Sequence, residues 1–381
     1  MPQEYFGLGS IGQLNDILSL VKPKSIFLVR GQKSYRSSGA EEKIGPFLAR
    51  YPVTEFAGFS SNTKIEDVKN GLELFRERFP EGNGALIMAI GGGSVLDLAK
   101  GIALLANNPG AAEDYVTKKK RIQPRIIPFM AIPTTAGTGS EATHFAAIYV
   151  DKTKYSLAHP SVVPDYAIID PSLTFSLPPY QTACTGLDAL AQAIESYWSI
   201  HAGEESKQYA GEAIRLALAH LEKAVTDPTP RDRVGMAKAA NLAGKAINLS
   251  FTTACHALSY PLTSYFGIPH GHAVALTLPE MVIYNSQITE KECNDSRGVR
   301  YVRNIMQELV VLFGVDSAEE IKRQIEQLMD HIGVERRLSP LGVASQNIAQ
   351  ITADFNAERG KNNPRQITRE QLQQLLEKVQ G

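Results

Sequence analysis

The chain has 381 residues, of which 43% are hydrophobic and 21% are charged, and its formal net charge is -1. This composition is typical of a globular protein large enough for two domains, and the lack of a basic excess argues against binding to nucleic acid or to a membrane surface. Three scattered cysteines without a CxxC pair, no signal-peptide pattern and no apolar stretch of membrane-spanning length predict a cytoplasmic protein.

The first part of the chain alternates short apolar runs with helical segments. The predicted strands are Ser25–Arg30, Ala85–Ile90, Ile126–Ile132, Ala146–Val150 and Tyr166–Ile169. Nearly continuous apolar strands suit a parallel sheet that is buried on both faces. Their alternation with helices predicts right-handed βαβ units and therefore a doubly wound α/β domain.

The pattern changes after Leu177, where long segments of helical period replace the strands. The predicted helices are Ala183–Tyr197, Glu204–Val225, Arg233–Ile247, Arg300–Leu312, Ala318–Ile332 and Arg369–Val379. Their apolar residues recur at three- and four-residue spacing, and no convincing strand remains. Pro178 and Pro179 mark the boundary and a candidate hinge. We therefore expect an α/β domain over 1–177 and an all-helical domain over 178–381.

A glycine-rich loop, Gly91-Gly92-Gly93-Ser94, follows one buried strand and opens a helix. Glycines allow a ligand to approach the backbone closely, and the free N–H groups and positive dipole end of a helix attract a diphosphate. A tight strand–helix turn that binds nothing would look the same, because GGGS is not the GxGxxG fingerprint.

A second polar loop runs from Pro133 to Glu141 and carries three threonines, one serine and two glycines directly after another strand. Hydroxyl groups and bare backbone at the carboxyl edge of a sheet suit a phosphate-bearing ligand. A flexible hydroxylated loop is the alternative, but two such loops after two strands favour a nucleotide site.

Two histidines, His256 and His270, stand in one compact block, and Asp188 and Gln192 lie four residues apart on one face of a predicted helix. A carboxylate on an otherwise apolar helix is costly unless it is paired. Two imidazoles and a carboxylate with an open position describe a catalytic divalent metal site. The alternative is that Asp188 is capped or paired locally and that the histidines are structural.

Four motifs in order, GGGSVLDLAK, IPTTAGTGSEAT, TGLDALAQAIESY and HALSYPLTSYFGIPHGHAVAL, resemble those of the iron-containing (group III) alcohol dehydrogenase family over nearly the whole chain. The resemblance implies a Rossmann-like dinucleotide-binding domain, an all-α metal-binding domain and an active site in the cleft between them. It also implies the interconversion of an aldehyde and an alcohol with NAD(H) or NADP(H), in a cytoplasmic homodimer.

Transferred position by position, the resemblance assigns a role to each candidate residue. Asp188, His256 and His270 would hold Fe²⁺ or Zn²⁺, with Gln192 as a further candidate ligand, and His256, His270 and Tyr260 would be catalytic. The cofactor-binding candidates are Gly31, Asn62, Gly92, Gly93, Ser94, Asp97, Thr134, Thr135, Thr138, Ser140 and Lys154. Among these, Gly92, Gly93 and Ser94 would hold the diphosphate, the three threonines the nicotinamide, and Lys154 the ribose.

Three positions depart from the family's pattern. Gln192 replaces a second metal-binding histidine, and an amide oxygen is a weaker ligand. Tyr260 replaces a proton-relay histidine, and the ordinary pKa of a phenol, about 10, makes it a poorer acid–base group. Gly31 replaces the aspartate of NAD-preferring members; with Arg30 and Lys33 beside it, a 2′-phosphate is tolerated, which favours NADPH.

The segments around Gln192–Trp198 and Gly267–His272 look most like those of a subgroup that reduces phosphonoacetaldehyde to 2-hydroxyethylphosphonate. A phosphonate requires a basic partner, for which Arg359, Lys361 and Arg365 are the candidates. A general short-chain alcohol or propanediol dehydrogenase is the main alternative. A dehydroquinate synthase-like lyase and a metal-free nucleotide-binding relative are further alternatives.

Overall fold

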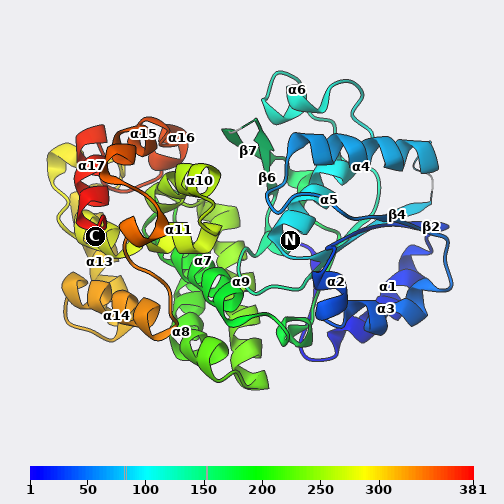
Figure 1. Cartoon of the computed structure of the whole chain (residues 1–381), viewed down its shortest axis with the longest axis horizontal. Coiled ribbons are helices and arrows are strands. Elements are labelled where there is room, and N and C mark those ends of the chain that lie inside the picture. The colour runs from blue at the N-terminus through cyan, green and yellow to red at the C-terminus, as the bar shows by residue number, and fades with distance from the viewer. Residues whose placement is uncertain (81, 83, 152) are drawn as a thin grey trace. The chain divides into compact units, whose positions relative to one another are not determined.

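The first unit of the computed structural model, Met1–Leu177, contains a six-stranded parallel sheet in the order β1-β8-β5-β4-β2-β3 (Figure 1). The structure describes residues 1–80, 82, 84–151 and 153–381. The sheet strands are β1 (Gln3–Phe6), β2 (Ser25–Arg30), β3 (Val53–Phe56), β4 (Ala85–Gly91), β5 (Phe129–Pro133) and β8 (Tyr166–Ile169). The helices of this unit are α1 (Leu14–Val21), α2 (Ser34–Ser37), α3 (Ala40–Leu48), α4 (Ile65–Arg78), α5 (Gly93–Leu105) and α6 (Ala112–Val116).

Helices cover both faces of this sheet, as its apolar strands require. Ile26 and Leu28 of β2 belong to the core beneath α1 and α3, whereas Phe27 and Val29 belong to the core beneath α4 and α5. Figure 1 shows these two helix groups on opposite sides of the strands. Side chains alternate between the faces of a strand, so a run of consecutive apolar residues fills both cores.

One predicted strand of the sheet belongs elsewhere. Residues 145–150 form β6 (Phe145–Val150), which pairs antiparallel with β7 (Thr153–Ala158) in a separate two-stranded hairpin. The prediction that residues 146–150 extend the parallel sheet was therefore wrong. Every second or third residue of β6 is only partly buried, whereas all residues of β4 and β5 are buried. The predicted strand at 126–132 begins three residues later, at Phe129.

The loops after β2 and β4 lie at the point of the sheet where the strand order reverses, the topological switch point. From β2 the chain continues to β3 on one side, and from β4 it continues to β5 on the other. In open α/β sheets, ligands bind where neighbouring strands lead away in opposite directions. Gly31 and the loop at Gly91–Ser94 lie at this point, where the Gly31 N–H donates to the Ile90 carbonyl at 3.1 Å.

The second unit, Pro178–Gly381, is helical, and the described residues contain no named strand there. Its helices are α7 (Pro179–Trp198), α8 (Glu204–Thr226), α9 (Pro230–Ser250), α10 (Ala254–Phe266), α11 (His270–Ala275), α12 (Leu278–Ser286), α13 (Val299–Phe313), α14 (Ala318–His331), α15 (Ile348–Ala353), α16 (Ala357–Gly360) and α17 (Arg369–Lys378). The predicted α/β and all-helical architecture is confirmed. Helix α7 is buried on nearly all sides from Thr182 to Trp198 and packs against α8, α9 and α11.

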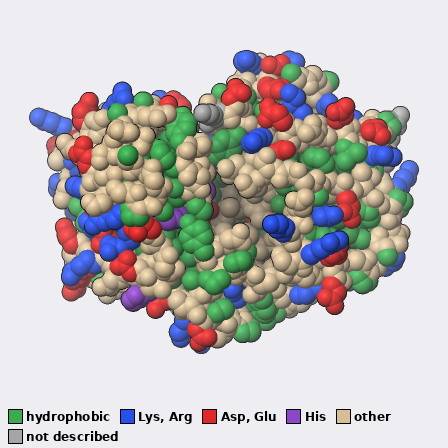
Figure 2. Space-filling view, in the orientation of Figure 1, with side chains coloured by type: hydrophobic (Ala, Val, Ile, Leu, Met, Phe, Trp, Pro, Cys, Tyr) green, Lys and Arg blue, Asp and Glu red, His purple; other side chains and the backbone are tan. Residues whose placement is uncertain are grey.

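Charged side chains of both signs are interspersed on the face of the molecule shown in Figure 2. This mixture agrees with the net charge of -1 and differs from the continuous basic surface that nucleic acid binding uses. Among the described residues, no helix combines the length and the apolar character needed to cross a membrane.

Candidate active site

The glycine loop of the first unit ends β4 and begins α5, so the positive end of the α5 dipole lies at Gly92–Ser94. The structure also gives these glycines a second role. A Cβ added to Gly93 would lie 2.6 Å from Thr138 Cγ2, and one added to Gly92 would lie 3.2 Å from Thr135 Cγ2. The glycines therefore allow the two polar loops to pack directly against each other.

A third segment contacts the start of α5. The Ser94 hydroxyl donates to the Ser61 carbonyl, and the Ser94 carbonyl accepts a hydrogen bond from the Thr63 hydroxyl at 3.0 Å. Asn62 lies exposed between these two contacts. Three of the predicted cofactor-binding segments thus meet around the N-terminus of α5.

The remaining cofactor candidates lie on the elements that flank these loops. Asp97 and Ser140 bind each other, with the Ser140 hydroxyl donating to Asp97 Oδ1 at 2.7 Å. Lys154 lies on β7 opposite Tyr149 of the hairpin. Thr134 is buried, and its hydroxyl has no hydrogen-bond partner among the described residues.

Arg30, which was expected to flank a 2′-phosphate, is engaged by its own neighbours. Its Nε lies 2.7 Å from Glu55 Oε2, and its guanidinium lies 5.0 Å from the centre of the Tyr35 ring. Lys33, the other predicted cation, is exposed. A phosphate that bound Arg30 would therefore have to compete with Glu55.

In the second unit, three helices bring together the predicted metal ligands. One potential ligand atom from each of Asp188 on α7, His256 on α10 and His270 on α11 lies within 4.8 Å of the others. His256 Nε2 is 3.3 Å from Asp188 Oδ1, and the two imidazole rings are 5.4 Å apart. The structure therefore gathers residues separated by more than 80 positions into one compact cluster.

Gly271 explains how α11 comes so close to α7. A Cβ at this position would lie 1.9 Å from the Cys184 carbonyl oxygen and 2.8 Å from Asp188 Cβ. The next residue, His272, is buried and contacts the Tyr180 hydroxyl and the Glu335 carbonyl through its two ring nitrogens, which gives it a structural role. Close backbone packing thus places His270 beside Asp188.

Glu195 is a residue whose role the sequence interpretation missed. It is fully buried one helical turn beyond Gln192, and its carboxylate accepts hydrogen bonds from the Thr253 hydroxyl at 2.6 Å, the Cys255 N–H at 2.7 Å and His256 Nδ1. A carboxylate behind a histidine fixes which ring nitrogen carries the proton and how the ring is oriented. The spacing Asp188, Gln192, Glu195 on one helix face was the available signal.

Ser259 has the corresponding place behind His270. Its hydroxyl donates to the His256 carbonyl at 2.7 Å and lies 3.2 Å from His270 Nδ1. A hydroxyl has a single proton, so in this arrangement Nδ1 of His270 is the donor. Both histidines then present Nε2 to the cluster.

The two carboxylates dominate the electrostatics of the cluster. Burial acts to lower the pKa of His256, but the charges of Glu195 and Asp188 outweigh it and raise this pKa from 6.5 to about 9. For Glu195, burial acts to raise the pKa, and the His256 charge with the surrounding hydrogen bonds lowers it below its usual value. Without a metal, the cluster therefore favours a protonated imidazole between two carboxylates.

Two positions that depart from the resembled motifs lie on helices that carry the cluster. Gln192 is buried, and its Oε1 has no hydrogen-bond partner among the described residues. Tyr260 stands one turn after His256 on α10, and its ring is stacked 6.2 Å from the His270 ring. An amide oxygen and a phenol thus occupy the two positions at which the resemblance led us to look for imidazoles.

The three basic candidates for an anionic substrate differ in their surroundings. Arg365 is bound to Glu292 at 3.0 Å and stacks on Tyr284, so it has a structural role. Lys361 is exposed and pairs with Glu358 at 2.8 Å. Arg359 is half-buried on α16, which packs against α10, and its guanidinium pairs with no carboxylate among the described residues.

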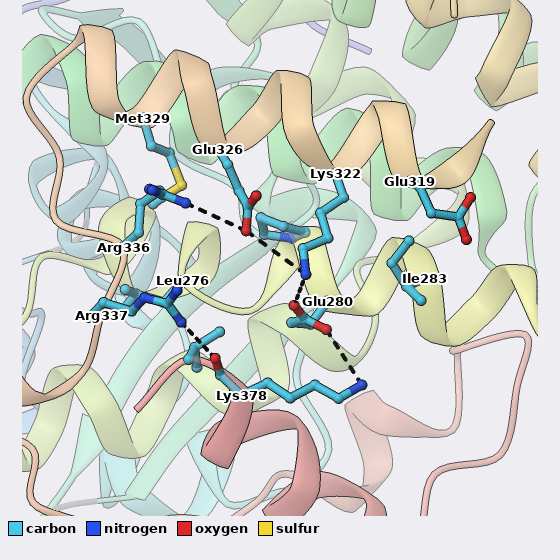
Figure 3. Close-up of a pocket in the computed structure, with 12 residues that line it drawn as sticks. Leu276, Glu280, Ile283, Glu319, Lys322, Glu326, Met329, Arg336, Arg337 and Lys378 are labelled. Carbon is cyan, nitrogen blue, oxygen red and sulfur yellow. Dashed lines mark hydrogen bonds and ion pairs between the residues drawn. The ribbon is translucent and has the colours of Figure 1, made fainter. Parts of the chain in front are cut away.

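A cavity of about 440 Å³ lies among α12, α14 and α17 and contains none of the predicted site residues. Figure 3 shows its ion pairs: Lys322 and Lys378 both reach Glu280, and Arg336 reaches Glu326. Three of the four basic side chains that line this cavity therefore pair with its carboxylates, as in a structural network.

Comparison with known proteins identifies the family. The profile described as iron-containing alcohol dehydrogenase matches residues 2–171, and that of the C-terminal part of the same family matches residues 182–380. The chain is 30% identical to long-chain-alcohol dehydrogenase 1 of Geobacillus thermodenitrificans over 93% of this chain and 88% of the relative. It is 35% identical to phosphonoacetaldehyde reductase of Streptomyces viridochromogenes over 76% of this chain and 74% of the relative.

The solved structures agree with these matches. Sulfoacetaldehyde reductase from Bifidobacterium kashiwanohense, in complex with NAD⁺, superposes with a TM-score of 0.86 at 30% identity, covering 99% of this chain and 96% of that one. A 1,3-propanediol oxidoreductase gives a TM-score of 0.85 at 28% identity, covering 99% and 98%. The resemblance carried by the four motifs is confirmed: the chain belongs to the iron-containing alcohol dehydrogenase family of oxidoreductases.

Proposed function

We propose that this protein is a metal-dependent, NADPH-preferring reductase of a small aldehyde that carries an anionic group, with phosphonoacetaldehyde as the best candidate. The observation that carries the proposal is the cluster of Asp188, His256 and His270, whose potential ligand atoms lie within 4.8 Å of one another. One carboxylate and two imidazoles are the donor set of a catalytic divalent site with an open coordination position.

The residues of the cluster fit Fe²⁺ or Zn²⁺, because a carboxylate and two imidazoles gathered this closely are ligands that these cations accept. A bound cation would take the place of the proton that otherwise compensates the buried carboxylates. The buried Gln192 Oε1 supplies one more oxygen nearby on α7. When bound, a divalent cation polarises a carbonyl oxygen and stabilises the negative charge that develops on it. Glu195 and Ser259 orient the two imidazoles, and Tyr260 Oη is our candidate to donate the final proton to the alcohol oxygen.

The first unit supports dinucleotide binding through its paired polar loops. The N-terminus of α5 suits a diphosphate, and the buried, unpartnered hydroxyl of Thr134 offers a hydrogen bond to a ligand. Gly31 lacks the carboxylate that would repel a 2′-phosphate, and Lys33 is exposed beside it. These features support NADPH over NADH.

Two of the named relatives reduce aldehydes with an acidic headgroup, a phosphonate and a sulfonate. A similar substrate would require a cation with free hydrogen-bond donors. Of the three basic candidates, Arg359 alone is half-buried and not engaged by a carboxylate in the described structure. We therefore assign the recognition of the substrate anion to Arg359.

A panel of aldehydes assayed with NADPH and NADH, before and after chelation and metal restoration, tests this proposal. We expect phosphonoacetaldehyde to give the highest kcat/KM, NADPH to be preferred, and chelation to remove activity. R359A should raise KM for phosphonoacetaldehyde but not for an uncharged aldehyde, whereas K361A, which removes an exposed lysine, should change neither. Higher kcat/KM for propanal or 3-hydroxypropanal would favour a general alcohol or propanediol dehydrogenase, and turnover without net NADPH oxidation would favour a lyase.

A further inference from the structure

Lys100 is a buried cation that no part of the proposed chemistry uses. It lies on α5 two turns after the glycine loop, and its relative exposure is 0%. Its Nζ donates to the Thr143 carbonyl at 3.0 Å, the Thr143 hydroxyl at 2.8 Å and the Phe145 carbonyl at 2.9 Å. An ammonium group has three N–H donors, so none remains for a substrate or cofactor.

The acceptors of Lys100 lie where the second polar loop, residues 133–141, ends and β6 begins; this loop is called the threonine loop below. Asp97, one turn earlier on the same helix, holds the same region: its Oδ1 accepts from the Ser140 hydroxyl at 2.7 Å and its Oδ2 from the Ala147 N–H at 2.9 Å. Two oppositely charged side chains of α5 therefore bind the end of the threonine loop and the first residues of β6.

The N-terminus of α5 holds the other end of the same loop. Gly92 and Gly93 lie directly against Thr135 and Thr138, with no space for a Cβ at Gly93. One rigid helix thus contacts the threonine loop at its beginning, through the glycines, and at its end, through Asp97 and Lys100. Rigid support of this kind is what holds binding groups in their productive geometry.

We infer that Lys100 is a positioning residue of the dinucleotide site, which sets the distance between the threonine hydroxyls and the backbone N–H groups of the glycine loop. The inference rests on the proposed dinucleotide role of these loops. A buried ammonium is costly unless all its donors are satisfied, and a methionine would fill similar space without that cost. The three hydrogen bonds to Thr143 and Phe145 explain why a charged side chain is present, because an apolar side chain could not form them.

Two sets of variants test the inference in the full-length, metal-loaded protein. K100M removes all three hydrogen bonds, and T143V removes the hydroxyl acceptor while keeping the shape, whereas T143S keeps the hydroxyl and removes a methyl group. We expect the NADPH Kd, measured by cofactor fluorescence, to rise about tenfold or more for K100M and about fivefold for T143V, and to stay within about twofold for T143S. Metal content should not change.

R125M is the matched control for general destabilisation. Arg125 is also a nearly buried cation of the first unit, but it donates to Ser161, Val163 and Asp165, away from both polar loops. R125M should lower the Tm and leave the NADPH Kd unchanged.

The outcomes separate this inference from the proposed function. If the unmodified protein binds neither NADPH nor NADH, the proposed function fails. If it binds the dinucleotide but a folded K100M binds equally well, the inference is overturned. If K100M does not fold, the threonine pair decides: a larger effect of T143S than of T143V would show that packing, and not the hydrogen bond from Lys100, matters at this position.

Discussion

The two units differ in how the charged side chains of their candidate sites are compensated. In the first unit, Lys100 and Asp97 are matched by neutral partners of the adjoining loop, so the polar loops are held in place without any ligand. In the second unit, Asp188 and Glu195 are gathered around two imidazoles. A set of charges that is satisfied internally gives a preformed site, whereas an excess of buried carboxylate gives a site that requires a cation.

H270A should have the largest effect and tests the difference most directly. Loss of one of three proposed ligands should reduce kcat/KM at least about a thousandfold, because the cation contributes several kcal/mol of charge stabilisation. The NADPH Kd should change little, since His270 belongs to the helical unit. Retention of full activity, measured together with metal content, would contradict the proposed metal site.

E195Q should weaken metal binding by roughly 10- to 100-fold, which is the usual consequence of changing the partner behind a metal-binding histidine. The amide of glutamine keeps the size of the side chain but removes the negative charge that lies beside His256. E280Q changes another buried carboxylate of the same unit, outside the cluster, and serves as the control. Competition with a fluorescent chelator measures both affinities; equal affinity of E195Q and the unmodified protein would remove Glu195 from the site.

Metal uptake should depend steeply on pH. Because the pKa of His256 is raised to about 9 without metal, its ring is protonated at neutral pH and must lose that proton to bind a cation. The apparent affinity should therefore rise about tenfold per pH unit up to about pH 9 and then level off. In the metal-free protein the same shift stabilises the fold fully below pH 6.5, and this stabilisation is lost as the pH rises through 9.

An indicator dye in weak buffer can measure the proton released per metal bound. We expect about one proton at pH 7.5 and almost none at pH 10. Below pH 7.5, dinucleotide binding should lack this slope, because burial lowers the pKa of Lys100 only to about 8. Metal affinity independent of pH between 6.5 and 8.5 would show that His256 is already neutral.

Two alanine substitutions in the glycine loop should have the smallest effects and should differ from each other. G93A places a Cβ 2.6 Å from Thr138 Cγ2, whereas G92A places one 3.2 Å from Thr135 Cγ2. An overpacked contact typically costs roughly 1–3 kcal/mol, so G93A should raise the NADPH Kd about fivefold or more and G92A less than about twofold. Titration of both variants with NADPH checks the order, and a larger effect of G92A would contradict the loop contact.

Much of this architecture could be predicted because local pattern determines it. The apolar runs of β2 and β4 and the long helical periods after Leu177 follow from burial, whereas the candidate ligand set came from residue types and spacing together with the family resemblance. Residues 145–150 were misplaced because a short half-buried strand carries no signal for its partner. Glu195 was missed because its role depends on Thr253, Cys255 and His256, which only the tertiary structure brings to it.

Gly271 has a consequence for how variation at this position should be interpreted. Glycine to alanine in a helix ordinarily increases stability, since alanine is the better helix former. Here the added methyl group would collide with the carbonyl of Cys184 and with Asp188, and α11 would have to withdraw from α7. A change that keeps every proposed ligand intact would then be expected to abolish metal binding, so efforts to retune the proposed metal preference should mutate Gln192 and leave residue 271 as it is.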